Sequence, residues 1–328
     1  MIQPKTGKTK QAPRRSKTAA ASASAIPRMP VARWVQLQQS VHDLLIAEEA
    51  DGFVANLDAI HAEIGQQMHH HADATLTTLI YLGATEINLY SATHSVLVSA
   101  VCALVARQTL AWPASDCDAV AKAALSMNIE MTALQDHLAR QSQRPSAEQQ
   151  RLIDLHCVLG ADLLAEFGVK DKLWLDAVRH HHDKTPGPLA AREPFSRLAR
   201  LIERVDVYAA RMAPREGRSP LPPEMAMSSC RLDENSQVDE AGQAVIDTLG
   251  KYPPGSTVRL SNGESGIVVG RSRGAQAPKV VALIDANGKA LPSPTLRHTG
   301  LKQFRVLQST AHASLGSAAN LEKVLRLI

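Results

Sequence analysis

The amino-acid sequence predicts a mainly α-helical protein with a small antiparallel β unit near its C-terminus. Hydrophobic residues make up 45% of the 328 residues but aromatic residues only 3%, and alanine and leucine dominate. This composition is typical of packed helices rather than of a β-sandwich. The length suggests about two units, and the pattern of residues changes after residue 250, which predicts one large helical unit and one small unit of strands.

Between residues 29 and 250, apolar residues recur at the spacing of amphipathic helices. An N-terminal helical segment over residues 29–75 is expected to hold two helices with a turn at Asp51-Gly52. The main helical domain is expected over residues 76–250. The predicted helices of this part of the chain are 72–112, 114–140, 146–166, 171–183, 195–212 and about 238–250, with an irregular stretch over 213–235.

Two of the predicted helix starts carry residues that resemble N-caps. Ser115 precedes Asp116, and Ser146 is followed three residues later by Gln149, the pattern of a capping box. We therefore expect these residues to cap the starts of the helices predicted over 114–140 and 146–166.

A small β unit is expected over residues 251–300, beginning after Tyr252-Pro253-Pro254-Gly255. Apolar and polar residues alternate there, and Asn262-Gly263 and Asn287-Gly288 are strong signals for two-residue hairpin turns. A unit of this size is expected to pack on the helices rather than to fold alone. The C-terminal segment 301–328 is predicted to form a last helix from about residue 304.

Residues 1–28 are predicted to be a disordered basic tail. This stretch holds seven Lys and Arg residues and no acid, so its charge is +7. The whole chain has a net charge of +4, so the remaining residues sum to −3. Such a tail can contact nucleic acid or anionic lipid. No aromatic residue lies among these charges, so the simpler interpretation is a solvated extension, and nucleic acid is not the expected partner.

The cysteines and the apolar runs predict a cytoplasmic protein without a membrane span. The four cysteines have no CxxC spacing, and the N-terminus does not resemble a signal peptide. The longest apolar run, over residues 96–106 and interrupted by Ser99, is far shorter than the roughly 20 residues that span a bilayer.

Histidine is the chemically unusual component, with thirteen in the chain. Imidazole and carboxylate groups are ligands that a hydrolytic transition metal accepts. Spacing alone does not show that they converge, because they lie on different predicted helices. The run His69–His71 points in three directions about 100° apart on a helix, which favours a solvated face. The candidates for a cluster are His94, His156, His180, His181, His182, Asp183 and Asp206.

The order of five motifs between residues 76 and 250 resembles the HD-GYP family of metal-dependent phosphohydrolases. His94-Ser95 precedes an apolar stripe, and Met127-Asn128-Ile129-Glu130-Met131 stands where the family has His-Asp-Ile-Gly-Lys. His156 with Gly160 matches His-Pro-x-x-Gly, and His181-His182-Asp183 is similar to His-His-Glu. Asp206-Val207-Tyr208 matches the start of Asp-x-Tyr-Asp-Ala, whereas the Gly-Tyr-Pro loop of the family is absent.

The resemblance implies an HD-superfamily helical bundle and a metal site. In the family, iron or manganese ions activate a water that attacks the phosphodiester of cyclic di-GMP. Three motif positions depart from the family, because Met127 and Asn128 replace the His-Asp pair and Met131 replaces the phosphate-binding Lys. The implied metal ligands that remain are His94, His156, His181, His182 and Asp206.

The expected function is therefore that of a degenerate family member, a binding or regulatory module in cyclic di-GMP signalling with one divalent metal or none. A protein signalling partner is part of this expectation. Two alternatives stay open, an active metal-dependent phosphodiesterase that uses the remaining ligands, and a helical scaffold whose basic tail contacts nucleic acid or membrane. For single residues, a hydrogen-bonded core role for His94 or His156, and a salt-bridge role for Asp206, also stay open.

Overall fold

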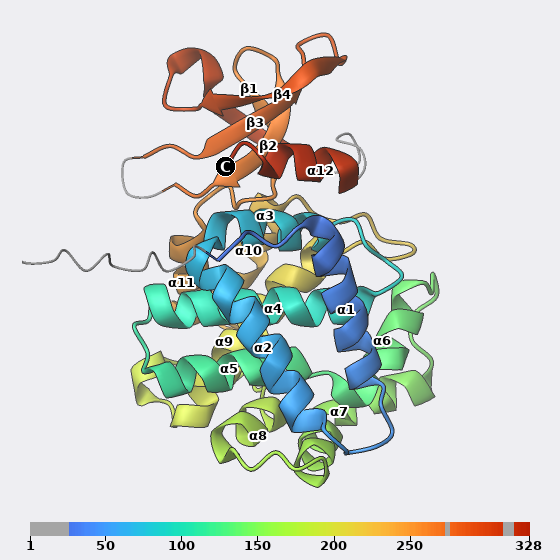
Figure 1. Ribbon diagram of the computed structural model, residues 1–328. Coiled ribbons are helices and arrows are strands. Elements are labelled where there is room, and N and C mark those ends of the chain that lie inside the picture. The colour runs from blue at the N-terminus through green and yellow to red at the C-terminus, as the bar shows by residue number, and fades with distance from the viewer. Residues whose placement is uncertain (1–25, 273–275, 311–317) are drawn as a thin grey trace, which may run out of the picture.

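The computed structural model describes residues 26–272, 276–310 and 318–328. It confirms a mainly helical architecture with a small antiparallel sheet, and the sheet lies at one end of the helical unit (Figure 1). The predicted basic tail falls largely on residues 1–25, outside the described residues. The helices are α1 (Val31–Leu45), α2 (Phe53–His70), α3 (Ala72–Gly83), α4 (Tyr90–Gln108), α5 (Ala114–Ser126), α6 (Thr132–Ala139), α7 (Ala147–Glu166), α8 (Lys172–Arg179), α9 (Pro194–Met212), α10 (Pro223–Cys230), α11 (Glu240–Leu249) and α12 (Ala318–Leu325).

Helix α4 lies at the centre of the helical unit, between α1 and α2 on one side and α9 on the other (Figure 1). It is the one described helix that is long and apolar enough to pass as a membrane span, and 89% of its most apolar window is buried inside the fold. Buried residues of α1 and α2, such as Trp34 and Leu57, belong to the same apolar cluster as Val98 of α4. The N-terminal segment and the main helices therefore share one core.

Several predicted helices are interrupted in the structure. The stretch 72–112 forms α3 and α4, which are separated by a turn at residues 84–89. The stretch 114–140 is broken after Ser126, where a 3-10 turn at Ile129–Met131 precedes α6. The helix expected over 171–183 ends at Arg179 as α8, and the stretch expected to be irregular contains α10. Apolar periodicity continues across these short breaks, so it did not reveal them.

Only one of the two predicted helix caps is present. Ser146 Oγ accepts a hydrogen bond from the Gln149 backbone N–H at 3.2 Å, and Gln149 Oε1 accepts one from the Ser146 N–H at 2.9 Å. This capping box fixes the start of α7. Helix α5 instead begins after Pro113, so the prediction of a cap at Ser115 is wrong.

The sheet is antiparallel with the strand order β4-β3-β2-β1-β5. Gly263 and Gly288, with φ of +86° and +80°, lie in the turns predicted at Asn262-Gly263 and Asn287-Gly288. A fifth strand, β5, pairs with β1 where a last helix from residue 304 was expected, and among the described residues after β5 the helix is α12. The strands are β1 (Thr257–Leu260), β2 (Ser265–Gly270), β3 (Lys279–Ile284), β4 (Ala290–His298) and β5 (Val306–Thr310).

The sheet packs on α3 through an apolar cluster and one buried arginine. Tyr81 of α3 and Ile267 of β2 belong to that cluster together with residues of β3 and α12. Arg271, just after β2, pairs through Nε with Asp73 Oδ1 at 2.5 Å, and its Nη1 donates to Gln108 Oε1 at 3.0 Å and to the Thr248 carbonyl at 3.3 Å. The side chain of Arg271 thus joins three helices to the sheet.

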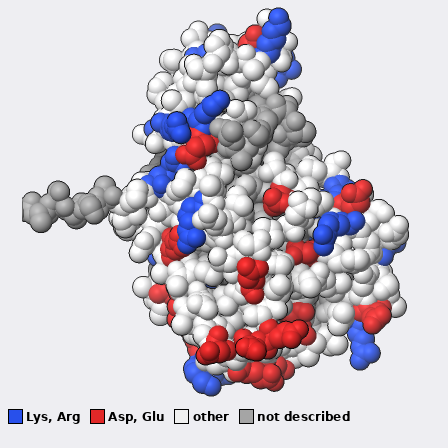
Figure 2. All heavy atoms as spheres, turned by 45° about the vertical axis from the view of Figure 1, so that its right-hand side comes forward, with Lys and Arg blue, Asp and Glu red and all other residues white. Residues whose placement is uncertain are grey.

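Charged side chains are unevenly distributed over the face shown in Figure 2. Acidic side chains gather at the end of the helical unit far from the sheet, whereas Lys and Arg are more frequent near the sheet (Figure 2). Arg28, the last residue of the predicted tail, pairs with Glu322 of α12 at 2.9 Å. The end of that tail is therefore held against the fold.

A cluster of charges around two buried arginines joins α9 to the segment before α11. Arg200, 1% exposed, donates to Asp239 at 2.8 Å and to Glu234 at 2.9 and 3.3 Å. Arg204 donates to Glu234 at 2.7 Å and to the Leu232 carbonyl at 2.8 Å. Each arginine therefore has hydrogen-bonded anionic partners, which buried charges require.

This cluster predicts a loss of stability in acid. Burial opposes ionisation of Glu234, but the hydrogen bonds from Arg200 outweigh it and lower the pKa of Glu234 to about 2. Because the folded pKa lies below the ordinary value of 4.5, this contribution to stability is complete above that value and is lost as the pH falls toward 2. Urea unfolding between pH 6 and pH 2 should give a shallower decline for Glu234→Gln than for the wild type. The exposed-site variant Glu166→Gln should keep the wild-type slope, and equal slopes for all three proteins would contradict the assignment.

Candidate metal centre

Four side chains with metal-binding atoms converge where α7 faces the turn after α8. His156 and Cys157 come from the middle of α7, and His181 and His182 follow the end of α8. The ligand atoms of these four residues all lie within 4.8 Å of one another. His156, Cys157 and His181 are buried, whereas His182 is exposed.

The rings of His156 and His181 are oriented as metal ligands. Nδ1 of His156 lies 2.5 Å from the Ile153 carbonyl oxygen, and Nδ1 of His181 lies 2.7 Å from that of Val178. A carbonyl only accepts, so each Nδ1 carries the proton and donates it, which leaves the lone pairs on Nε2. The two Nε2 atoms lie 3.2 Å apart. Two facing lone pairs repel, and a cation between them removes that repulsion.

The electrostatics of these rings also fit a metal. Burial lowers the pKa of His181 to about 3, and burial likewise lowers the pKa of His156. Both imidazoles are therefore neutral at ordinary pH, which is the form that binds a metal ion. The donor set and its orientation fit a divalent transition metal.

His94 and Asp206 bind each other beside this cluster rather than joining it. His94 Nε2 lies 2.7 Å from Asp206 Oδ1, and the His94 ring stacks on Tyr90 with 5.9 Å between centroids. Burial alone would raise the pKa of Asp206, but the hydrogen bond from His94 outweighs it and holds that pKa well below its usual range. Asp206 is therefore an ionised carboxylate beside the cluster.

A small pocket of about 160 Å³ brings most of the predicted site residues together. Asn128 and Met131, from the motif that departs from the family, line it together with His156, His182 and Asp206. Asn128 Nδ2 donates to Gln135 Oε1 at 3.4 Å. Residues that are far apart in the sequence thus meet at one place.

Three predicted site residues do not line this pocket. His181 is a fully buried member of the cluster, and His94, 3% exposed, pairs with Asp206. Met127 is fully buried in the apolar core, so its side chain is a core residue and not part of the pocket wall. Of the weaker candidates, His180 packs against Phe195, and Asp183 accepts a hydrogen bond from the Thr185 hydroxyl.

Sequence reasoning missed two residues of the site, Cys157 and Arg215. Neighbouring residues on a helix point about 100° apart, so Cys157 was not considered beside His156. Arg215 lines the pocket, donates through Nε to the Tyr90 hydroxyl at 3.0 Å, and lies over the Tyr90 ring at 4.8 Å. No signal in the sequence marked Arg215, because it lies in a stretch predicted to be irregular.

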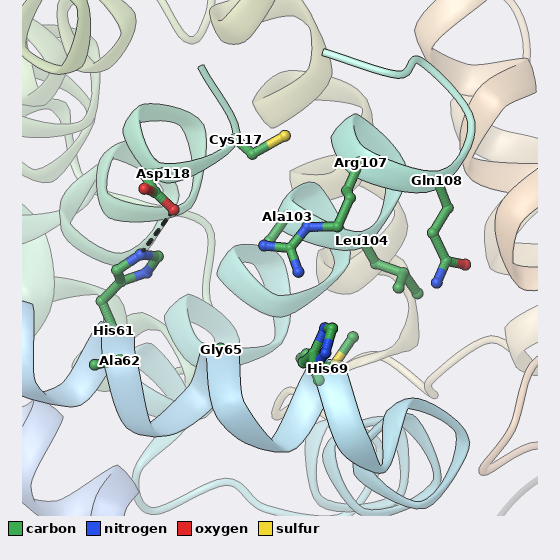
Figure 3. Close-up of a pocket in the computed structure, with 11 residues that line it drawn as sticks. His61, Ala62, Gly65, His69, Ala103, Leu104, Arg107, Gln108, Cys117 and Asp118 are labelled. Atoms are coloured by element: carbon green, nitrogen blue, oxygen red, sulfur yellow. Dashed lines mark ion pairs between the residues drawn. The ribbon is translucent and has the colours of Figure 1, made fainter. Parts of the chain in front are cut away.

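A second pocket, of about 300 Å³, lies between α2, α4 and α5 (Figure 3). His61 pairs there with Asp118 at 3.4 Å, and His69, Arg107 and Gln108 also line it. His69 and His70 are exposed, as predicted for a solvated face, whereas His71 is half-buried and its Nε2 lies 2.8 Å from the Ile26 carbonyl oxygen, so the prediction does not hold for His71. Within the described residues, one group of three or more side chains brings metal-binding atoms close together, and it consists of His156, Cys157, His181 and His182.

Comparison with known proteins finds a similar curated protein. No family model and no solved structure matches the chain. A curated relative from Pseudomonas aeruginosa, named as a cyclic di-GMP phosphodiesterase, is 28% identical over 304 aligned positions. The alignment covers 84% of this chain and 72% of the relative. The similarity therefore extends through most of both proteins.

Proposed function

We propose that this protein binds cyclic di-GMP at the pocket beside the histidine cluster and acts as a regulatory module of cyclic di-GMP signalling, with impaired hydrolysis. The relative's name supports the ligand, and the resemblance to the HD-GYP family supports the kind of site. The observation that carries the proposal is that Asn128, Met131, His156, His182 and Asp206 line one pocket. A cytoplasmic location and a protein partner that responds to the bound state belong to the same proposal.

The pocket suits one phosphodiester group rather than a whole cyclic dinucleotide. Its volume of about 160 Å³ is smaller than the roughly 300–1,000 Å³ of pockets that enclose drug-sized ligands. The guanidinium of Arg215 supplies a positive charge at the pocket wall, and Arg binds phosphate oxygens through two parallel hydrogen bonds. The bases of the ligand would then lie outside the pocket.

The loss of hydrolysis follows from two residues of the pocket wall. Asn128 offers a neutral amide where the family has a carboxylate that bridges two metals, so a second metal lacks its anionic ligand. Met131 offers a thioether where the family has a phosphate-binding Lys, so a cation that would face the phosphate is missing. A bound metal would be held by the histidine cluster, where it would supply positive charge beside the phosphate.

Replacing Arg215 by alanine should weaken cyclic di-GMP binding about 10- to 100-fold. A hydrogen bond to a charged group contributes roughly 1.5–3 kcal/mol, and about 1.4 kcal/mol corresponds to a factor of ten in affinity. Titration calorimetry on the full chain measures this effect. The exposed Arg211→Ala variant removes the same charge from α9 and should bind as the wild type does. No binding by the wild type at high protein concentration would overturn the ligand, and equal affinities for both variants would overturn the role of Arg215.

A second candidate function is an active metal-dependent phosphohydrolase. It is favoured by the survival of the ionised Asp206 in the same pocket as His156 and His182. Turnover of cyclic di-GMP with added Mn²⁺ or Fe²⁺, lost in the His181→Ala/His182→Ala double variant, would establish it. Absence of turnover under both metals would leave the regulatory function.

A further inference from the structure

We infer that the second pocket, between α2, α4 and α5, binds a small organic acid through its carboxylate group. Its lining shares no residue with the pocket beside the histidine cluster, so this inference goes beyond the proposed function and does not depend on it. All the residues that line it belong to these three helices. The pocket wall is therefore built from regular elements, which hold side chains more firmly than loops do.

Arg107, near the end of α4, supplies the positive charge of this site. Its guanidinium extends into the pocket, above the helix that carries Gly65 and His69 (Figure 3). The described residues of the pocket wall include one acid, Asp118, whose Oδ1 lies 3.4 Å from His61 Nε2. Asp118 is thus held by His61, and in the described part of the chain no carboxylate forms an ion pair with Arg107. The guanidinium is therefore available to an anion from solution.

The hydrogen-bonding groups beside Arg107 also favour an anion. Gln108 Oε1 accepts a hydrogen bond from Arg271 Nη1 at 3.0 Å, so the side-chain N–H groups of Gln108 are left to donate elsewhere. Burial raises the pKa of the Cys117 thiol, so Cys117 is neutral and does not repel a negative charge. One guanidinium without an acidic partner matches a single negative charge, and its planar fork binds the two oxygens of a carboxylate. A carboxylate therefore fits better than the dianion of phosphate.

Small and apolar side chains shape the rest of the pocket. Its volume of about 300 Å³ is at the lower end of the range for small-molecule sites. Gly65 lies in the interior of α2, where glycine is less favourable than alanine, and a Cβ atom at this position would approach no neighbouring side chain within 4 Å. Packing therefore does not require glycine here, whereas its missing side chain widens the pocket. Met68 and Leu104 line the same space, so the walls suit a ligand with a short apolar body beside its charged group.

Titration of the full chain with acetate and butanoate, followed by NMR signals of the ligands, tests the class of ligand. Butanoate should bind about 15-fold more tightly than acetate, because each of its two additional methylenes contributes about fourfold when buried. Butanamide has a similar shape but no charge, and it should bind about tenfold more weakly than butanoate. Inorganic phosphate that binds more tightly than butanoate, or the absence of saturable butanoate binding, would overturn the inference.

Two variants test whether butanoate binds at this pocket. Gly65→Leu places a side chain in the open space and should lose butanoate binding, because the leucine occupies the volume of the ligand. Arg107→Gln should weaken butanoate binding about 10- to 100-fold and leave butanamide binding unchanged, because it removes only the charged partner.

The control Arg151→Gln removes an exposed arginine of α7 outside this pocket and should bind butanoate as the wild type does. Arg107 is itself exposed, so Arg107→Gln keeps the test decisive if circular dichroism shows that Gly65→Leu fails to fold. Wild-type affinity for butanoate in Arg107→Gln, or in a folded Gly65→Leu, would show that the acid binds elsewhere and would overturn the inference.

Discussion

Replacing Arg200 by alanine is expected to lower the free energy of unfolding by about 3–5 kcal/mol, the cost of removing one partner from a buried group of charges. Arg200 is 1% exposed, and its guanidinium bonds both Asp239 and Glu234. Asp239 is itself 4% exposed, so its carboxylate would be left buried with one partner fewer. Chemical denaturation of the wild type and Arg200→Ala measures the difference.

Arg211→Ala is the matched control for this effect. Arg211 is an exposed arginine on the same helix, and surface substitutions usually change stability by less than about 0.5 kcal/mol. A loss below about 1 kcal/mol for Arg200→Ala would show that the charge cluster does not stabilise the junction of α9 with α11. The Arg200→Lys variant should lie between the two, because Lys keeps the charge but lacks the planar fork.

A divalent transition metal is expected to raise the free energy of unfolding by about 4 kcal/mol when the free ion is at 1,000 times its dissociation constant. The ion removes the repulsion between the two Nε2 atoms 3.2 Å apart and binds only when α7 and the turn after α8 are in place. With a shift of roughly 2 °C for each kcal/mol in a chain of this size, the melting temperature should rise by about 8 °C. Thermal unfolding with the added metal and with a chelator measures the shift.

The double variant His181→Ala/His182→Ala separates specific from general effects of the metal. It removes two of the three histidines of the cluster, so its melting temperature should be the same with the added metal and with the chelator. A rise equal to that of the wild type would place the stabilising ion elsewhere. The variant His69→Ala/His70→Ala removes two exposed histidines and should respond to the metal as the wild type does.

Sequence patterns predicted the helices and hairpin turns well where local chemistry decides the structure. The Ser146 capping box and the Asn-Gly turns depend on a few adjacent residues, and they are present as expected. The break between α5 and α6 was not predicted because no Pro or Gly marks it, and buried residues continue through it. Strand β5 was missed because its residues pair with β1 about fifty positions earlier, and such long-range pairing leaves no periodic signal of its own.

Only part of the site was predicted, because contacts between side chains of distant helices also leave no signal in the sequence. Family motifs pointed to His156, His181 and His182, and the structure brings these three together. The motifs could not show that His94 and Asp206 bind each other, or that Cys157 faces the cluster, because both depend on the rotation of side chains at helix contacts. Met127 was expected at the site because of its position in a motif, whereas its side chain lies in the apolar core.

The sheet is not a removable module of this chain. Arg271 lies beyond the helical unit, yet it meets Asp73, Gln108 and the Thr248 carbonyl, which belong to three different helices. A chain shortened to end at Gly250 would leave the Asp73 carboxylate without its cation and would expose the apolar side of α3 around Tyr81 to water. In evolution, loss of the sheet would therefore require new polar residues on α3. Substitutions on α3 and in the sheet are accordingly expected to depend on each other.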